Sequence, residues 1–188
     1  MDDQLDLTGK LLIAMPGMGD PRFEHAVVYL CAHSDEGAMG IIVNKPLPDL
    51  AMSDLLKQLK IAPNRHFREG EVHFGGPVEH GRGFVLHDAG YASDVGSMQV
   101  EGGFSLTATL DILEDLARGA GPERRILALG YAGWGPGQLE GELAQNAWLT
   151  VDASPELVFD ADDIDKWDAA LERLGVSAVM LSSDAGRA

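Results

Sequence analysis

Residues 125–148, RILALGYAGWGPGQLEGELAQNAW, constrain the fold of this chain more than any other stretch. The run from 125 to 132 is apolar and rich in strand-forming residues, which predicts a buried central strand. The five glycines from 130 to 141 then predict a tight turn. Leu139 and Leu143, four positions apart, predict a helix after the turn, with both side chains on its buried face.

The rest of the chain shows the same kinds of signal. Strand-forming residues and turn chemistry predict strands at 10–15, 26–33, 38–46, 71–77, 83–88, 98–100, 148–153 and 177–183. Spaced apolar residues and caps predict helices at 53–61, 109–118 and 162–175, and Ser154-Pro155 is typical of a helix start. Hairpin-like strands come first and strand–helix alternation comes later, which favours an α+β fold over a regularly alternating parallel one. The length predicts a single domain over 1–188, with loose ends at 1–7 and 184–188.

The charge balance bears on the partners of the protein. Thirty acidic residues against fourteen basic ones give a formal net charge of −16. Such a chain is repelled by phosphate backbones, so nucleic-acid binding is disfavoured. The densest basic groups, at 65–68 and 124–125, form no continuous stripe in the sequence, although folding could still bring them into a local patch.

Other features of the composition point to the cytoplasm. The single cysteine, Cys31, cannot form an internal disulfide, which suits a reducing compartment. The chain begins with the acidic stretch MDDQLDL, unlike a signal peptide, which has a basic start. No segment approaches the roughly 20 apolar residues of a membrane span. We therefore expect a cytoplasmic protein without a membrane segment.

The glycine-rich turn lacks three familiar catalytic or phosphate-binding patterns. A Walker loop needs a lysine after its glycines, and none occurs between Lys60 and Lys166. The dinucleotide fingerprint fails because Glu140 stands where its third glycine belongs. A nucleophile elbow needs a serine, and residues 130–133, GYAG, contain no hydroxyl or thiol at that point. A structural turn is favoured, with an anion-binding nest of backbone amides as the alternative.

Cysteine and histidine side chains offer further candidate sites. Cys31 and His33 lie on one face of a predicted strand, but about 6–7 Å apart, which is long for a nucleophile and its base. Several histidines on strands have carboxylates as potential companions, namely His25, His33, His73, His80 and His87 with Asp20, Glu71 and Asp88. None has the short paired spacing of a typical zinc site. We therefore assign no catalytic residue, no metal ligand and no cofactor.

Taken together, several motifs resemble the AlgH/YqgE family of bacterial proteins. They are LIAMPGMGDPRFEHAVVYLCAH, GAMGIIVNKP, HFGGPV, RGFVLHD and LALGYAGWGPGQLEGELAQNAWL, and the resemblance runs from about residue 8 to residue 181. It implies a single α+β domain with a mixed, strongly bent sheet that forms a pseudo-barrel flanked by helices. It supplies no accepted catalytic residue. One branch of the family is described as a regulator of alginate production, and members tend to be encoded beside a protein like a Holliday-junction resolvase.

Three hypotheses for function follow. The first is a noncatalytic regulatory or protein-interaction protein that acts through a protein partner and affects transcription only indirectly. A homo-oligomer is compatible with this role. The second is an enzyme or a small-ligand or metal-binding protein whose pocket is framed by the glycine-rich loops, with Asp20, His33, Asn44, His87 and Tyr131 as the ligand-binding groups. The third is a DNA-binding regulator that uses Arg65, Arg68, Arg124 or Arg125.

Overall fold

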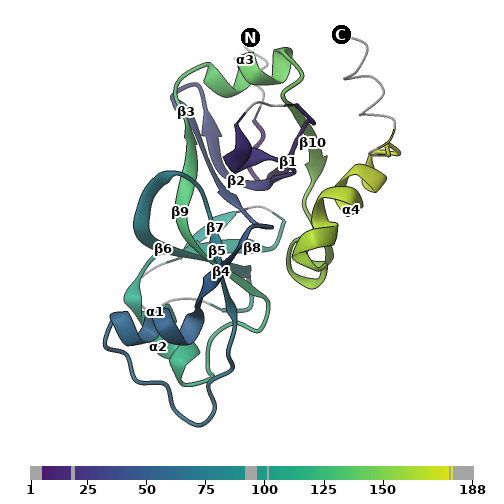
Figure 1. The fold of residues 1–188 in the computed structure, drawn as a ribbon. Coiled ribbons are helices and arrows are strands. Elements are labelled where there is room, and N and C mark those ends of the chain that lie inside the picture. Colours follow the sequence, from purple (N-terminus) through teal and green to yellow (C-terminus); the bar gives the residue numbers. More distant parts are fainter. Residues whose placement is uncertain (1–5, 18–19, 92–96, 101, 178, 180–188) are drawn as a thin grey trace.

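A ten-stranded sheet curls around an apolar interior in the computed structural model, which describes residues 6–17, 20–91, 97–100, 102–177 and 179 (Figure 1). The strands are β1 (Lys10–Ala14), β2 (Val27–Ser34), β3 (Gly37–Ile42), β4 (Pro46–Ala51), β5 (Glu71–Phe74), β6 (Val78–Asp88), β7 (Met98–Val100), β8 (Phe104–Thr107), β9 (Arg125–Trp134) and β10 (Trp148–Asp152). Their order in the sheet is β10-β1-β2-β3-β9-β6-β8-β7, with β5 also paired to β9, and β4 to β5.

Strand β9 is the centre of this sheet. It pairs with β6 along one side, and on the other side with β5 through Leu127–Leu129 and with β3 through Ala132–Trp134. The β5–β9 pair is parallel, whereas the other pairs of described strands are antiparallel. One strand therefore joins the two halves of the curled sheet.

Helices pack on both halves of the sheet (Figure 1). They are α1 (Met52–Gln58), α2 (Leu110–Ala117), α3 (Gln138–Ala144) and α4 (Lys166–Arg173), with short non-α turns η1 (Pro21–Phe23), η2 (Glu156–Asp160) and η3 (Asp163–Asp165). Helices α1 and α2 lie together at one end of the molecule, α3 lies at the other end, and α4 flanks the sheet. None of the helices in the described ranges is long and apolar enough to cross a membrane.

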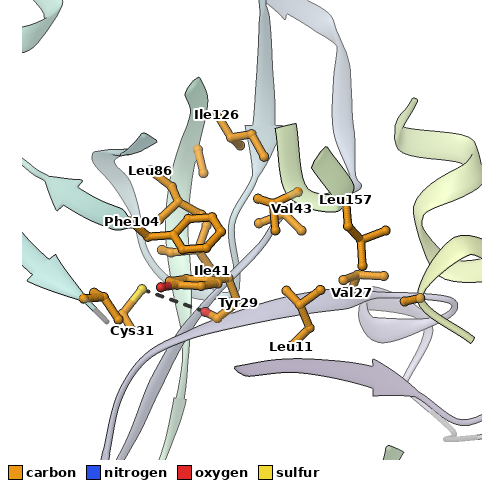
Figure 2. Close-up of a cluster of buried hydrophobic side chains, with 14 of the residues drawn as sticks. Leu11, Val27, Tyr29, Cys31, Ile41, Val43, Leu86, Phe104, Ile126 and Leu157 are labelled. Atoms are coloured by element: carbon orange, nitrogen blue, oxygen red, sulfur yellow. Dashed lines mark hydrogen bonds between the residues drawn. The ribbon is translucent and has the colours of Figure 1, made fainter. Parts of the chain in front are cut away.

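The core follows the alternation of side chains along the strands. In β2, Val27, Tyr29 and Cys31 face the interior, where they join Leu86, Phe104 and Ile126 (Figure 2). Val28 and Leu30 face the opposite side, in a second cluster with Trp134, Leu139 and Trp148 under α3. A third cluster packs α1 and α2 against β5, β6 and β9. Because strands such as β1 and β2 are buried on both faces, they appear in the sequence as continuous apolar runs.

The predicted α+β class and strongly bent, helix-flanked sheet are confirmed, and the curled sheet forms a half-barrel. Two predicted strand boundaries were wrong, one at a proline and one at an expected turn. The strand expected to end at Pro46 is followed by β4, which tolerates Pro46 and Pro48 because it is paired on one side only. The stretch between Val78 and Arg82, expected to be a turn, belongs to β6, which has an irregular register there.

Two other differences lie later in the chain. Strand β8 was not expected, and the last helix is shorter than 162–175 because Asp163–Asp165 forms a 3-10 turn before α4. Of the strand expected at 177–183, only Ser177 and Val179 are among the described residues, and Val179 is helical.

Candidate ligand-binding cleft

A cleft of about 650 Å³ lies between β5, the start of β9 and the segment that leads into α4. Its size is in the range of small-molecule sites. Its charged lining residues are Glu71, Glu123, Asp160, Asp162 and Asp163 against Arg125 and Lys166. The excess of carboxylates makes the cleft acidic.

His73 and Asp163 form the base of this cleft. His73 lies on β5, and its Nε2 donates to Asp163 Oδ2 at 2.8 Å. The side chains of His73 and Asp163 are 8% and 18% exposed. Glu71, two positions earlier on the same face of β5, brings a carboxylate oxygen to 4.0 Å from the same Nε2. The imidazole therefore faces two carboxylates at once.

Lys166 completes the buried group. Its Nζ donates to Asp163 Oδ1 and to the backbone carbonyl of Val43, both at 2.8 Å, and its side chain is 3% exposed. Burial lowers the pKa of Lys166, although the bond to Asp163 and nearby negative charges oppose this effect. Burial raises the pKa of Asp163, but the hydrogen bonds from His73 and Lys166 outweigh it and leave this pKa well below its usual range. Asp163 is therefore ionised at neutral pH.

Two short non-α turns make the outer wall of the cleft. Ser154 Oγ accepts from the backbone N–H of Leu157 at 3.2 Å, so the helix start expected at Ser154-Pro155 is present. The turn that follows, η2, is a π-helix, a geometry that occurs often at functional sites. Asp160 at its end is bonded to Arg124 at 2.5 and 3.1 Å, which holds this wall to the start of β9.

Arg125 is a half-buried residue of the cleft lining. Its Nη1 donates to the Pro122 carbonyl at 3.1 Å. Burial, and then the positive charge of Arg68, lower the pKa of Arg125. Folding therefore brings residues of the two basic groups of the sequence within electrostatic reach of each other, while Arg124 is used in an ion pair.

The five residues expected to bind a ligand are distributed over the molecule. His33 and Tyr131 line one open hollow, Asn44 lines a second and Asp20 a third, whereas His87 is completely buried. None of the five is among the described residues that line the acidic cleft.

Four of these five side chains are bonded to the fold. Asn44 bonds to the backbone of Val27 and His25, at 2.9 and 2.8 Å. His87 bonds to the Asp88 carbonyl and to Thr107.

The other two bonded residues lie near chain turns. His33 Nδ1 accepts from Leu7 N–H at 3.0 Å, and its Nε2 pairs with Glu140. Asp20 caps η1 and pairs with Arg22. These side chains hold backbone segments and neighbouring elements in place, and their role in ligand binding stays a prediction.

The interior position of Cys31 bears on the cysteine hypothesis. Cys31 packs beside Tyr29 in the main core, and its Sγ lies 3.8 Å from the Tyr29 carbonyl (Figure 2). Burial raises the pKa of the Cys31 thiol to about 12, so almost none of it is thiolate at neutral pH. His33 is bonded elsewhere. The pair therefore lacks the activated thiolate that a nucleophile requires.

The glycine turn after β9 has a structural role in the described residues. Gly137 adopts a left-handed conformation, with φ of 74°, directly before α3. Glu142 on this helix accepts from the indole N–H of Trp134 at 3.1 Å and of Trp148 at 2.9 Å. The turn and helix thus hold β9 to β10.

Sequence reasoning named two of the three residues that meet in the cleft. Glu71 and His73 were considered as metal companions, but Asp163 was not. Asp163 lies 90 positions from His73 in the sequence, so only packing of η3 against β5 brings them together. The three-residue spacing of Asp163 and Lys166 before a helix was the available local signal.

Comparisons with known proteins identify the family of this chain. A family model described as AlgH-like matches residues 11–179. The chain belongs to the AlgH-like family. A UPF0301 protein of Ruegeria pomeroyi is 58% identical to this AlgH-like chain over 185 residues, covering 98% of the chain and 100% of the relative. A UPF0301 protein of Paracoccus denitrificans is 55% identical and covers both proteins completely.

Solved structures agree with the fold. The solution structure of the AlgH protein from Pseudomonas aeruginosa matches with a TM-score of 0.79 and 40% identity, over 97% of this chain and 96% of that one. A crystal structure of protein DIP2367 from Corynebacterium diphtheriae matches with a TM-score of 0.71 at 19% identity, over 92% of this chain and 90% of that one, and it supports the fold alone. The names of these relatives state no reaction or ligand, so the function of this AlgH-like protein is argued from its site.

Proposed function

We propose that this AlgH-like protein is a noncatalytic cytoplasmic binding protein that holds a small cationic ligand in the acidic cleft. The observation that carries the proposal is the excess of five carboxylates over two cationic side chains among the described residues that line a cavity of about 650 Å³. Burying charge costs free energy unless it is compensated. Lys166 and His73 compensate Asp163, and Arg124 compensates Asp160. The remaining carboxylates, Glu71, Glu123 and Asp162, retain their attraction for a cation.

The lining of the cleft supports binding rather than covalent catalysis. Among the described residues that line it there is no serine, threonine, cysteine or tyrosine. Cys31 lies in the apolar core and is protonated at neutral pH. A ligand in this cleft would therefore meet no hydroxyl or thiol nucleophile, and the imidazole, amine and carboxylate of His73, Lys166 and Asp163 are bonded to one another.

The regulatory part of the proposal extends the protein-partner role expected from the sequence. The wall of the cleft includes Ile164, whose side chain is 87% exposed. A ligand bound behind this wall would contact a segment that also presents an apolar side chain to solvent. We propose that ligand binding in the cleft changes the affinity of this segment for a protein partner.

Native mass spectrometry tests the ligand-binding part. Protein purified without chelator is compared with Ala161→Trp, which places a large side chain in the cleft, and with Ala62→Trp, which places it on an exposed loop. We expect a bound mass in the parent protein and in Ala62→Trp, and its loss in Ala161→Trp. Isothermal titration with putrescine, spermidine and arginine as probes then measures affinity directly.

Two results would overturn the proposal. One is retention of the same bound mass or the same titration heat by Ala161→Trp, with circular dichroism showing that the variant is folded. The other is the absence of both a bound mass and binding of any of the three probes to the parent protein at millimolar concentration.

A further inference from the structure

Glu71, His73 and Asp163 have the arrangement of an incomplete metal coordination sphere. One ligand atom from each lies within 4.8 Å of the other two. The distances from His73 Nε2 to the two carboxylates are 2.8 and 4.0 Å. Ligands of a tetrahedral Zn²⁺ ion lie about 2.0–2.2 Å from the metal, and therefore roughly 3.3 Å from one another. To reach that spacing, His73 Nε2 and Asp163 Oδ2 would move apart by about 0.5 Å, and Glu71, whose side chain is 66% exposed, would move closer.

Lys166 fits the role of a group that orients a metal ligand. It binds Asp163 Oδ1, which leaves Oδ2 directed at His73. Ligating carboxylates in metal sites are usually held by such an outer hydrogen bond. Lys166 is itself fixed by the carbonyl of Val43, so the position of Asp163 is set by α4 and by the residue that follows β3.

The His73 imidazole presents one nitrogen to the carboxylates, and its other nitrogen has no described partner. The ring is buried, its Nε2 faces the two carboxylates, and its Nδ1 has no hydrogen-bond partner among the described residues. A metal on Nε2 moves the ring proton to Nδ1, which then lacks a described acceptor. Since this outer bond typically contributes about 10- to 100-fold to metal affinity, we expect micromolar rather than nanomolar binding.

From this geometry we propose that Glu71, His73 and Asp163 bind a divalent transition-metal ion, with Zn²⁺ as the reference ion. An imidazole with two carboxylates suits Zn²⁺, and three protein ligands leave a fourth position that faces the cleft. The inference rests on the proposed function, because it names the cation that the base of the cleft takes. The metal would in turn supply a binding point for a second ligand in the cleft.

A matched pair of variants tests the site. Glu71→Gln removes a proposed ligand, whereas Glu123→Gln removes an equal charge from another exposed carboxylate of the same cleft. Zn²⁺ affinity is measured by competition with a chromophoric chelator on the full chain. We expect one equivalent of Zn²⁺ in the parent protein, a loss of about tenfold or more in Glu71→Gln and in His73→Gln, and a change below about twofold in Glu123→Gln.

A second readout separates coordination from electrostatic attraction. In ¹⁵N-labelled protein, Zn²⁺ should shift the Nε2 resonance of His73 and move the ring proton to Nδ1. Equal losses in Glu71→Gln and Glu123→Gln, or no change at His73 on saturation, would overturn the metal site. If the metal site fails but putrescine or spermidine binding is still blocked by Ala161→Trp, the proposed function stands without it. If Zn²⁺ binds as expected and no organic probe does, the metal inference stands and an organic ligand is excluded.

Discussion

His87 shows how a single buried side chain can make stability depend on pH. Its Nδ1 donates to the Asp88 carbonyl at 2.7 Å and its Nε2 accepts from Thr107 at 2.8 Å, so both ring nitrogens are used by the neutral form. Burial lowers the pKa of His87 below its usual value near 6.5, although Asp88 opposes this effect. The stability that comes from neutral His87 is therefore complete above about pH 6.5 and is lost as the pH falls towards the lower pKa of the folded state.

We expect the free energy of unfolding to fall between pH 7.5 and 5.5, with a contribution from His87 of at most about 1.4 kcal/mol per pH unit. The measurement is urea unfolding at both pH values for the parent protein and for His87→Gln, which cannot take up the proton. The difference between the two pH values should be smaller in the variant. His80→Gln, which removes an exposed imidazole, is the control, and an equal effect of both substitutions would contradict the role of His87.

The connection between β5 and β6 depends, at the scale of elements, on close approach of backbones. Gly75 and Gly76 cross directly against β9, and a Cβ on Gly76 would lie 2.0 Å from the carbonyl carbon of Tyr131. Backbone atoms cannot move out of the way as a flexible side chain can. We therefore expect Gly76→Ala to cost more than about 3 kcal/mol of stability or to prevent folding.

Gly81, within β6, provides the comparison. A Cβ there meets nothing within 4 Å, so Gly81→Ala should change the free energy of unfolding by no more than about 1 kcal/mol. Urea unfolding monitored by tryptophan fluorescence measures both variants. A Gly76→Ala protein with the urea midpoint of the parent would show that β5 and β9 do not pack as described.

The whole molecule carries a formal net charge of −16, which opposes contact with nucleic acid. Arg124 is engaged with Asp160, and Arg125 is half-buried at the cleft, so two of the four arginines considered for DNA binding are partly occupied. We expect affinity for a 30-base-pair duplex to be weaker than about 100 µM at 150 mM salt, at or below the weak end of ordinary nonspecific binding. Fluorescence anisotropy with a labelled duplex measures it.

A steep salt dependence of the affinity for the duplex would instead indicate direct DNA binding. If binding were tighter than this, and if Arg65→Gln with Arg68→Gln reduced both the affinity and the salt slope, a local basic patch would outweigh the net charge. Asp35→Asn with Glu36→Gln, which changes the net charge by the same amount in the other direction and lies elsewhere on the surface, is the control for charge alone.

Much of the fold is predictable because its signals are local. Strands β1, β2 and β9 are predicted by apolar runs, and α2 by the spacing of its leucines. Each signal comes from residues close together in the sequence, and all four elements were expected. The cleft is different, since Lys166 and Val43 meet across 123 positions. A histidine that follows an apolar residue in a strand looks alike in EVHFG and FVLHD, yet His73 faces a cleft while His87 bonds within the core. Only tertiary packing separates these two cases.

The position of β9 in the chain also has a consequence for synthesis. Its three partners, β3, β5 and β6, all lie between residues 37 and 88, whereas β9 itself begins at residue 125. As the protein is made from its N-terminus, these earlier strands leave the ribosome with their pairing edges unsatisfied until the missing strand follows. Unpaired strand edges are prone to aggregation, and such long-range pairing slows folding. The nascent chain should therefore need protection most between the emergence of β6 and that of β9.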